Sequence, residues 1–178
     1  MINYLELNLI TSTFHAVLMF IMGAASVSKH TLILALKFSI GYNILDCILM
    51  KDSKMKNQLL FHHGLLISAA GYCVLFPTTT NLNIISLGFM SEITTPFLNI
   101  AWYYNSKKNK TDLEVFIFRL SSLLTFILYI PFRLALTPYV SYLVFQTDCP
   151  IKLFPVCFAA LNYYWFYKMY KKLVNMRT

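Results

Sequence analysis

Two adjacent histidines, His62 and His63, are the residues in this sequence best suited to chemistry, and they stand in a largely apolar stretch. A neutral imidazole near pH 7 can act as a general base or as a nucleophile, so either ring is a candidate catalytic group. Neighbouring residues on a helix diverge by about 100°, which argues against a metal site formed by this pair. We therefore predict a catalytic role for His62 and His63 and no metal site.

Further polar residues fall inside apolar stretches, where a charged side chain costs about 2.5–3.5 kcal/mol unless it has a partner, a wet cavity or a function. They are Asp46, Glu92, Asn99, Arg119 and Arg133. Counted by helical rise from the cytoplasmic ends, four helices bring polar groups to one depth, within roughly 6–8 Å of that boundary: Asp46, the pair His62–His63, Asn99 and Arg119. We predict that these residues face the inside of the protein and bind the substrate.

Each of these residues also has a purely structural interpretation. Asp46 and Arg119 could form a buried pair that only supports the fold, and Asn99 or Asn162 could bond between helices. Arg119 could also extend its side chain to the membrane boundary and do nothing else. The sequence leaves these alternatives open.

The elements that must position these residues are transmembrane helices. Of the 178 residues, 58% are hydrophobic and 12% charged, with a mean hydropathy of +0.60, which is too apolar for a water-soluble domain. One crossing needs about 20 apolar helical residues. Six blocks have about that size: Leu9 to Val27, Thr31 to Met50, Leu59 to Phe76, Leu82 to Tyr103, Val115 to Leu136, and Ile151 to Tyr170. The predicted fold is all-α, a single transmembrane domain over residues 1–178 with about six spans around a central lipid-accessible cavity.

The short apolar segment 139–147 does not fit the six blocks. It is too short to cross a bilayer, so the sequence leaves open whether it is re-entrant or interfacial.

The net charge of +8 is explained by where the basic residues lie. Six spans put ten of them on one side: Lys51, Lys54, Lys56, Lys107, Lys108, Lys110, Lys168, Lys171, Lys172 and Arg177. The opposite loops carry only Lys29 and Lys152. This is the positive-inside pattern, so we expect both termini in the cytoplasm and no nucleic-acid partner. The same loops could attract anionic lipid headgroups or the phosphates of a nucleotide-bearing cofactor.

Several stretches resemble one family when taken together and in order. They are YNILD (residues 42–46), FHHG (61–64), SEITTPFLN (91–99), Arg133 and NYYWF (162–166). This set resembles the TLC-domain family, which contains the ceramide synthases and a set of smaller TLC-domain-containing proteins. The resemblance covers about residues 29–175.

The resemblance implies a function in lipid metabolism. Ceramide synthases transfer a fatty acyl group from acyl-CoA to the amine of a sphingoid base in the endoplasmic reticulum, and their histidine pair, here His62 and His63, is catalytic. By analogy acyl-CoA is a co-substrate, with no permanently bound cofactor. The synthases follow their pair with a motif ending in His-Asp-x-x-Asp, whereas this chain continues GLLISAAGYCVLF after His63. The closer resemblance is therefore to the smaller proteins, which include regulators of membrane lipid composition.

Two hypotheses follow, and the sequence does not decide between an enzyme and a binding protein. In the first, the chain is an acyltransferase that uses His62 or His63, with a sphingoid base or related lipid as acceptor. In the second, it is a non-catalytic lipid-binding protein or regulator of membrane lipid composition. Membrane lipids are the expected partners in both, and assembly into a homo-oligomer is left open.

Overall fold

The described residues form six helical rods. The computed structural model describes residues 4–25, 27–49 and 56–175. Of the ten basic residues predicted to face the cytoplasm, Lys51, Lys54 and Arg177 lie outside the described part. The rods are α1 (Tyr4–Ala24), α2 (Lys29–Leu49), α3 (Lys56–Leu75), α4 (Thr79–Met90) continued by η1 (Ser91–Thr94) and α5 (Thr95–Ser106), α6 (Asp112–Tyr129) continued by η2 (Ile130–Ala135) and α7 (Leu136–Phe145), and α8 (Leu153–Asn175). The described residues form no strand, and the predicted all-α fold is confirmed.

Five of the rods are long and apolar enough to cross a membrane. They are Leu7–Ala24, Lys29–Ile48, Lys56–Leu75, Thr79–Ser106 and Asp112–Phe145. The sixth predicted span is also a helix, α8, but its composition keeps it out of this set, since Lys168, Lys171 and Lys172 crowd its second half. The sequence left the segment 139–147 unassigned. Most of it belongs to α7, which continues the fifth rod to Phe145, so it is not a separate element.

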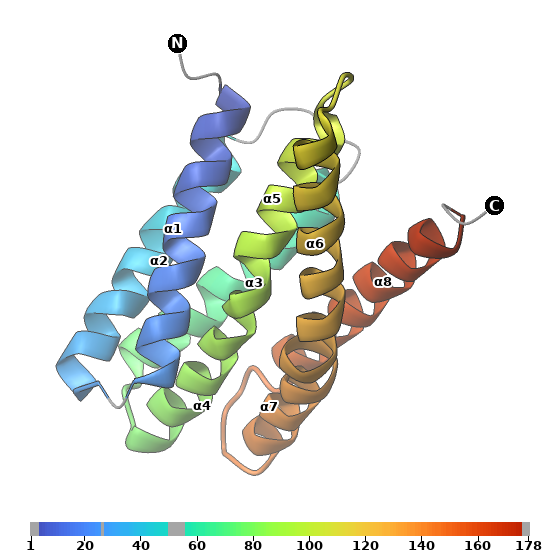
Figure 1. Cartoon of the computed structure of the whole chain (residues 1–178). Coiled ribbons are helices and arrows are strands. Elements are labelled where there is room, and N and C mark those ends of the chain that lie inside the picture. The colour runs from blue at the N-terminus through green and yellow to red at the C-terminus, as the bar shows by residue number, and fades with distance from the viewer. Residues whose placement is uncertain (1–3, 26, 50–55, 176–178) are drawn as a thin grey trace.

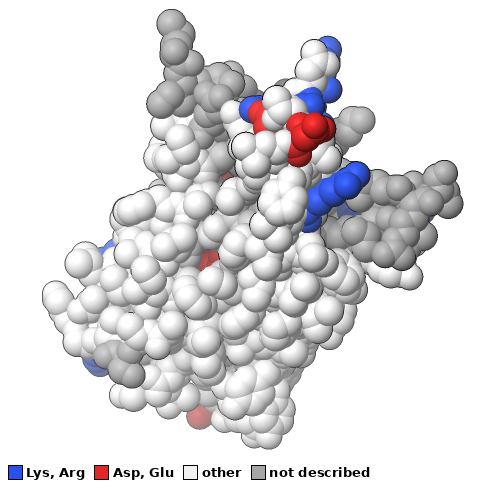
Figure 2. All heavy atoms as spheres, in the orientation of Figure 1, with Lys and Arg blue, Asp and Glu red and all other residues white. Residues whose placement is uncertain are grey.

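The rods run up and down, so that successive connections alternate between the two ends of the bundle (Figure 1). The start of α1 and the end of α8 lie at the same end, together with the connection between α5 and α6, and the upper half of α8 splays away from its neighbours (Figure 1). On the face shown in Figure 2, charged side chains gather mainly at this upper end, and the middle is almost free of them.

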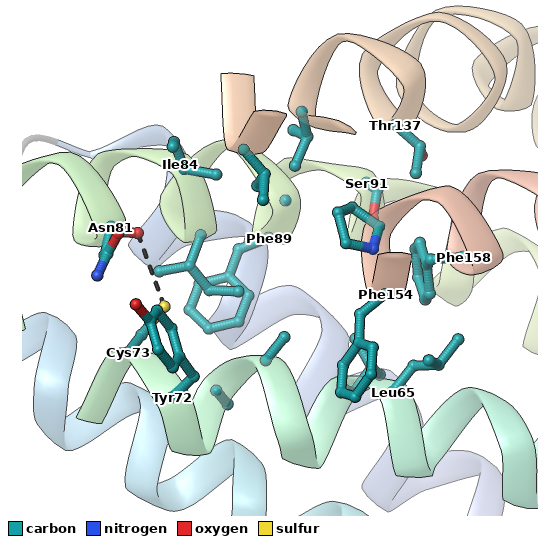
Figure 3. Close-up of a pocket in the computed structure, with 18 of the residues that line it drawn as sticks. Leu65, Tyr72, Cys73, Asn81, Ile84, Phe89, Ser91, Thr137, Phe154 and Phe158 are labelled. Carbon is teal, nitrogen blue, oxygen red and sulfur yellow. Dashed lines mark hydrogen bonds between the residues drawn. The ribbon is translucent and has the colours of Figure 1, made fainter. Parts of the chain in front are cut away.

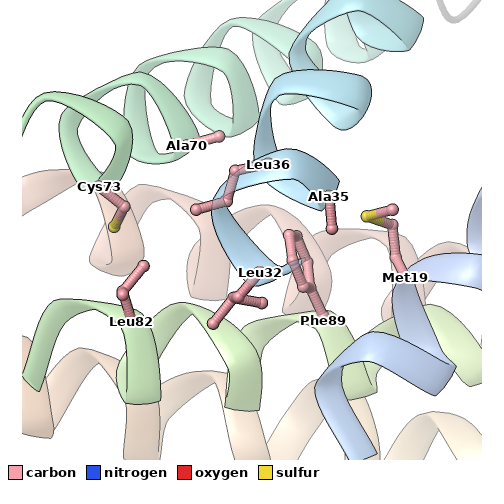
Figure 4. Packing of buried hydrophobic residues seen from close by; sticks show 8 residues of the cluster. All are labelled: Met19, Leu32, Ala35, Leu36, Ala70, Cys73, Leu82 and Phe89. Carbon is pink, nitrogen blue, oxygen red and sulfur yellow. The ribbon is translucent and has the colours of Figure 1, made fainter. Parts of the chain in front are cut away.

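An apolar core holds the first four helices together toward the lower end of the bundle. It consists of Met19, Leu32, Ala35, Leu36, Ala70, Cys73, Leu82 and Phe89, which converge from α1, α2, α3 and α4 (Figure 4). Small residues occur among large ones, so the four helices can approach closely. Met19, Ala70, Cys73 and Phe89 of this core also border an internal cavity.

Two rods are interrupted near the middle of the bundle, and each interruption lies at a proline. Pro96 has no backbone N–H, and the turn before it tightens into the 3-10 helix η1, where the Thr95 N–H donates to the Glu92 carbonyl. Pro131 lies in a π-helical turn, η2, in which the Leu136 N–H donates to the Pro131 carbonyl. The two irregular turns pack against each other.

Gly23 permits the closest approach between α1 and α4. A Cβ atom at this position would lie 2.5 Å from the Ser86 carbonyl oxygen and 2.9 Å from the Phe89 Cβ. The Ser86 hydroxyl also donates to the Gly23 carbonyl oxygen, at 2.9 Å. The backbones of the two helices therefore cannot separate to admit a side chain without loss of this hydrogen bond.

We predict that Gly23→Ala destabilises the protein by about 1–3 kcal/mol, because the added methyl group overpacks the contact between α1 and α4. Gly41→Ala is the matched control, since a Cβ there meets nothing within 4 Å. Thermal unfolding of the two purified variants in the same detergent measures the effect. Equal unfolding temperatures for both would contradict the close packing of these helices.

Candidate functional site

Arg133 is more deeply buried than any other described Lys, Arg, Asp or Glu, with 4% of its surface exposed. Its Nε donates to Thr94 Oγ1 at 2.9 Å and its Nη2 to Thr95 Oγ1 at 3.0 Å. Nη2 also lies 3.6 Å from Glu92 Oε1, and Thr95 Oγ1 donates to Glu92 Oε2 at 2.8 Å. Arg133 and Glu92 thus form a buried ion pair across the two irregular turns. Thr95 is hydrogen-bonded to both members of the pair, and Thr94 to Arg133 alone.

Asn162 connects this pair to α8. Three residues at successive turns of the fifth rod contact its side chain, which is 1% exposed. Tyr129 Oη and Arg133 Nη1 donate to Asn162 Oδ1 at 3.2 and 3.5 Å, and Asn162 Nδ2 donates to Thr137 Oγ1 at 3.3 Å. On a straight α-helix, residues four apart differ in direction by about 40°, so a third residue would turn away from the partner helix. The wider π turn corrects this rotation and keeps Tyr129, Arg133 and Thr137 on the face toward α8.

His63 forms a second cluster with α2. Its Nε2 lies 2.8 Å from Asp46 Oδ2 and its Nδ1 lies 2.5 Å from Asn43 Oδ1. The Asn43 amide is oriented by its Nδ2, which donates to the Ser39 carbonyl at 2.7 Å. Both ring nitrogens of His63 therefore contact side-chain oxygen atoms of α2. With both nitrogens occupied in this way, His63 is not free to act as a base or nucleophile.

His15, on α1, extends the second cluster. Its Nε2 lies 3.1 Å from Ser39 Oγ, and Ser39 Oγ in turn accepts from Asn43 Nδ2 at 3.3 Å. The His15 ring stacks on Tyr42 with the ring centroids 4.0 Å apart. A chain of polar contacts thus runs from α1 through α2 to His63 on α3.

His62 lies between the two clusters and is held by aromatic rings alone. Its ring stacks on Phe158 at 5.0 Å and contacts Trp165 at 5.2 Å, both on α8, and meets His63 edge-on at 5.4 Å. Its Nδ1 is the one buried polar side-chain atom without a hydrogen-bond partner among the residues that the structure describes. An unpaired buried polar atom costs about 1–3 kcal/mol, so it is retained against a free-energy penalty.

A cavity of about 120 Å³ lies behind Phe158, the stacking partner of His62, and extends toward the lower end of the bundle. Its wall is largely apolar and includes Leu65, Ile84, Phe89, Phe154 and Phe158 (Figure 3). Polar side chains lie at its two ends: His15, Ser39, Ser91, Glu92 and Thr137 at the level of the clusters, and Tyr72, Asn81 and Thr147 at the other end. From Asn81 to Ser91 the cavity follows α4 for about 15 Å. Its apolar lining suits a lipid chain, and because a cavity of about 150 Å³ holds only a benzene-sized group, it must widen to admit one.

The structure brings together most of the predicted site residues. His63 meets Asp46, and Glu92 meets Arg133, with His62 between the two pairs. Asp46 therefore pairs with His63 and not with Arg119. The predicted convergence relied on Asn99 and Arg119 for the fourth and fifth spans, whereas here Glu92 and Arg133 occupy those places.

Asn99 and Arg119 lie apart from both clusters. Asn99 Nδ2 donates to Ser12 Oγ and Thr13 Oγ1, so it links α5 to α1 beside a surface groove between these helices. Arg119 is exposed on α6, so the prediction that it faces the inside of the bundle is wrong. Arg119 lies only four residues inside its predicted span, so its long side chain can extend to the membrane boundary. The structure favours this alternative over a role inside the bundle.

Sequence reasoning missed His15, Thr94 and the aromatic partners of His62. His15 is the only ionisable residue in the first apolar block, so no second charged or titratable group in that block draws attention to it. The threonine pair 94–95 directly precedes a proline, and this is the only local signal that its hydroxyls are drawn into a broken turn.

The fold and the buried polar clusters define a polytopic helical membrane protein with an internal polar site and an apolar cavity. The family model for the TLC domain matches residues 7–171, nearly the whole chain, so the protein belongs to the TLC-domain family. The match includes α1 and hence His15. No curated protein and no solved structure matches the chain. Family membership together with the apolar helices indicates an integral membrane protein with a lipid-related function.

We predict that Thr94→Val lowers the free energy of unfolding by about 1–3 kcal/mol, because it leaves the Arg133 Nε–H without an acceptor in a site that is closed to water. Thr94→Ser keeps the hydroxyl and loses one methyl group, so it should cost less, about 0.8 kcal/mol. Thermal unfolding of both variants measures the difference. A serine variant less stable than the valine variant would contradict a structural role for this hydrogen bond.

Proposed function

We propose that this protein is an acyltransferase that moves a fatty acyl group from acyl-CoA to the amine of a sphingoid base or a related lipid, with His62 as the reacting residue. The observation that carries the proposal is the buried, unpartnered Nδ1 of His62, whose stacking partner Phe158 lines the apolar cavity. We assign the reaction to His62 and a supporting role to its neighbour His63, because the ring of His63 is fixed by Asn43 and Asp46.

The parts of such a site follow one another along the bundle axis. Basic residues lie at the upper end, where Lys108 is exposed and Lys107 contacts Glu114 at 2.6 Å. The hydrogen bond from Lys107 to Glu114 raises the pKa of Lys107, so this lysine stays charged at neutral pH. His62 lies six residues after Lys56, about 9 Å below that end. This order suits a CoA whose phosphates bind the loops while its acyl chain passes His62 into the cavity.

The proposed chemistry is transfer from a thioester to an amine. The amine nitrogen forms a bond to the acyl carbonyl carbon, and the bond from that carbon to sulfur breaks. His62 accepts the proton that the amine loses and returns it to the departing CoA thiolate, so the products are an N-acyl lipid and CoA. His63 meets the reacting ring edge-on at 5.4 Å and is itself held by Asn43 and Asp46, so it positions that ring.

Phe158 has a defined place in this proposal. Its ring lines the cavity and stacks on His62, so it forms the wall between the two. A rotation of this ring about its side-chain bonds would open the His62 Nδ1 to a chain in the cavity. Phe158 is therefore proposed as the residue that separates the reacting group from the cavity when no substrate is bound.

We predict that His62→Phe lowers the rate of N-acyl product formation by about 100-fold or more, because the general base is lost. The phenyl ring can keep the stacking on Phe158 and Trp165 and removes an unpaired polar atom, so the unfolding temperature should stay the same or rise. Product is measured by mass spectrometry after incubation of purified protein with acyl-CoA and a sphingoid base.

His63→Phe is the matched variant, since it changes the adjacent residue in the same way. It leaves Asp46 without its partner in the bundle and should destabilise the protein by about 3 kcal/mol or more. Wild-type protein that forms no product above the His62→Phe variant would rule out this substrate pair.

A non-catalytic lipid-binding protein, or regulator of membrane lipid composition, is the second candidate. It is favoured by the closed Arg133–Glu92 pair and by the absence of a second His or Asp motif after His63 in the sequence. Under this alternative, lipid extracted from the purified protein includes a bound acyl lipid, and His62→Phe changes its amount without any product in either protein.

We further propose that both termini face the cytoplasm and that the protein resides in the endoplasmic reticulum, by analogy with the ceramide synthases. The expected partners are membrane lipids, with acyl-CoA as a co-substrate. The basic residues support the orientation, because the described lysines of the α5–α6 connection and of α8 lie toward the same end of the bundle.

The sequon Asn109-Lys110-Thr111 tests this orientation. It lies in the connection between α5 and α6, so we predict that Asn109 carries no glycan when the protein is made in eukaryotic cells. Treatment with an endoglycosidase and electrophoresis of wild type beside Asn109→Gln checks this. A mobility shift specific to the wild type would place this connection in the lumen.

A further inference from the structure

His15 is a buried histidine that the proposed acyl transfer does not use. It lies on α1, is 6% exposed, and lines the polar end of the cavity together with Glu92 and Ser91. Stacking on Tyr42 and Phe38 fixes the plane of its ring. Its Nε2 is engaged by Ser39, whereas no hydrogen bond of its Nδ1 occurs among the described residues.

The hydrogen bonds around Ser39 determine which nitrogen of His15 carries the proton. Asn43 Nδ2 donates to Ser39 Oγ, so the lone pair facing Asn43 is occupied and the hydroxyl hydrogen of Ser39 is directed elsewhere. The one acceptor for it in the described structure is His15 Nε2, at 3.1 Å. No described carboxylate pairs with His15, and a neutral imidazole carries one proton. We therefore assign that proton to Nδ1, which makes Nδ1–H a donor.

A donor at the polar end of an apolar cavity selects an oxygen acceptor. The nearby Glu92 carboxylate is held by Arg133 and Thr95, so it is already neutralised and satisfied. An ammonium group at this point would face the N–H of His15, whereas a hydroxyl or carbonyl oxygen would accept from it.

We propose that His15 is a lipid-binding residue, whose Nδ1–H donates a hydrogen bond to a hydroxyl or carbonyl oxygen in the head of a lipid with its chain in the cavity. This rests on the lipid binding in the cavity that is part of the proposed function, but it does not require acyl transfer.

Two substitutions separate the two nitrogens of His15. His15→Gln keeps an amide near the position of Nε2, where it can bond Ser39, and loses the donor at Nδ1. His15→Asn places an amide N–H near the position of Nδ1 and loses the contact with Ser39. His30→Gln is the control, because His30 is exposed at the start of α2.

The measurement is displacement of a fluorescent fatty acid from the purified full chain by dodecanol, methyl dodecanoate or dodecane. In the wild type we expect at least one of the two oxygen-bearing probes to bind about 5-fold more tightly than the alkane, as for one net hydrogen bond. The tighter of the two identifies the oxygen as hydroxyl or carbonyl. The preference should persist in His15→Asn and His30→Gln and fall to about 1-fold in His15→Gln.

Equal binding of all three probes to the wild type, or a preference kept by His15→Gln and lost in His15→Asn, would overturn the role of His15. Failure to bind the fluorescent fatty acid at all would overturn the lipid-binding premise as well. Since no turnover is measured, an absence of N-acyl product bears on the proposed function of His62 and leaves this result intact.

Discussion

The ion pair between Arg133 and Glu92 is the interaction on which the rest of the site depends. A guanidinium inside a membrane bundle has no water to complete its hydrogen bonds, so the protein must supply the acceptors. Here the acceptors come from a 3-10 turn on one rod and from α8, while the arginine itself lies on a π turn. Both irregular turns occur at prolines, where the regular helical bonding is broken in any case.

The same interaction explains how α8 is held. Its upper half leaves the bundle (Figure 1), and its composition is the least apolar of the six rods. The side chain of Asn162 compensates, because it accepts from Arg133 and Tyr129 and donates to Thr137. Polar contacts of this kind hold helices together in lipid, where apolar surfaces gain little by leaving their surroundings. Phe158 and Trp165 of the same helix then enclose His62.

The sequence predicts the rods well and the partners of the polar residues only in part. Long apolar blocks predict helices because a bilayer imposes both their length and their composition. The pairing of Asp46 with His63 was not predicted, since a depth count gives the level of a residue and not its direction around the helix. Arg119 and Asn99 show the same limit, since Arg119 is exposed and Asn99 faces α1. The π turn changes the direction in which all later residues of the rod point. Pro131 is the only local sequence feature that indicates such a turn.

The fifth rod is longer than the membrane it is built to cross. From Asp112 to Phe145 it has 34 residues, about 50 Å of helix, against a hydrocarbon core of about 30 Å. This hydrophobic mismatch must be absorbed by tilt, by the bend at Pro131 or by local thickening of the bilayer. The exposed Tyr139 and Tyr142 of α7 are of the type that anchors at the headgroup level. Bilayer thickness thus acts directly on the helix that carries Arg133, and membranes of different thickness would hold this rod at different angles.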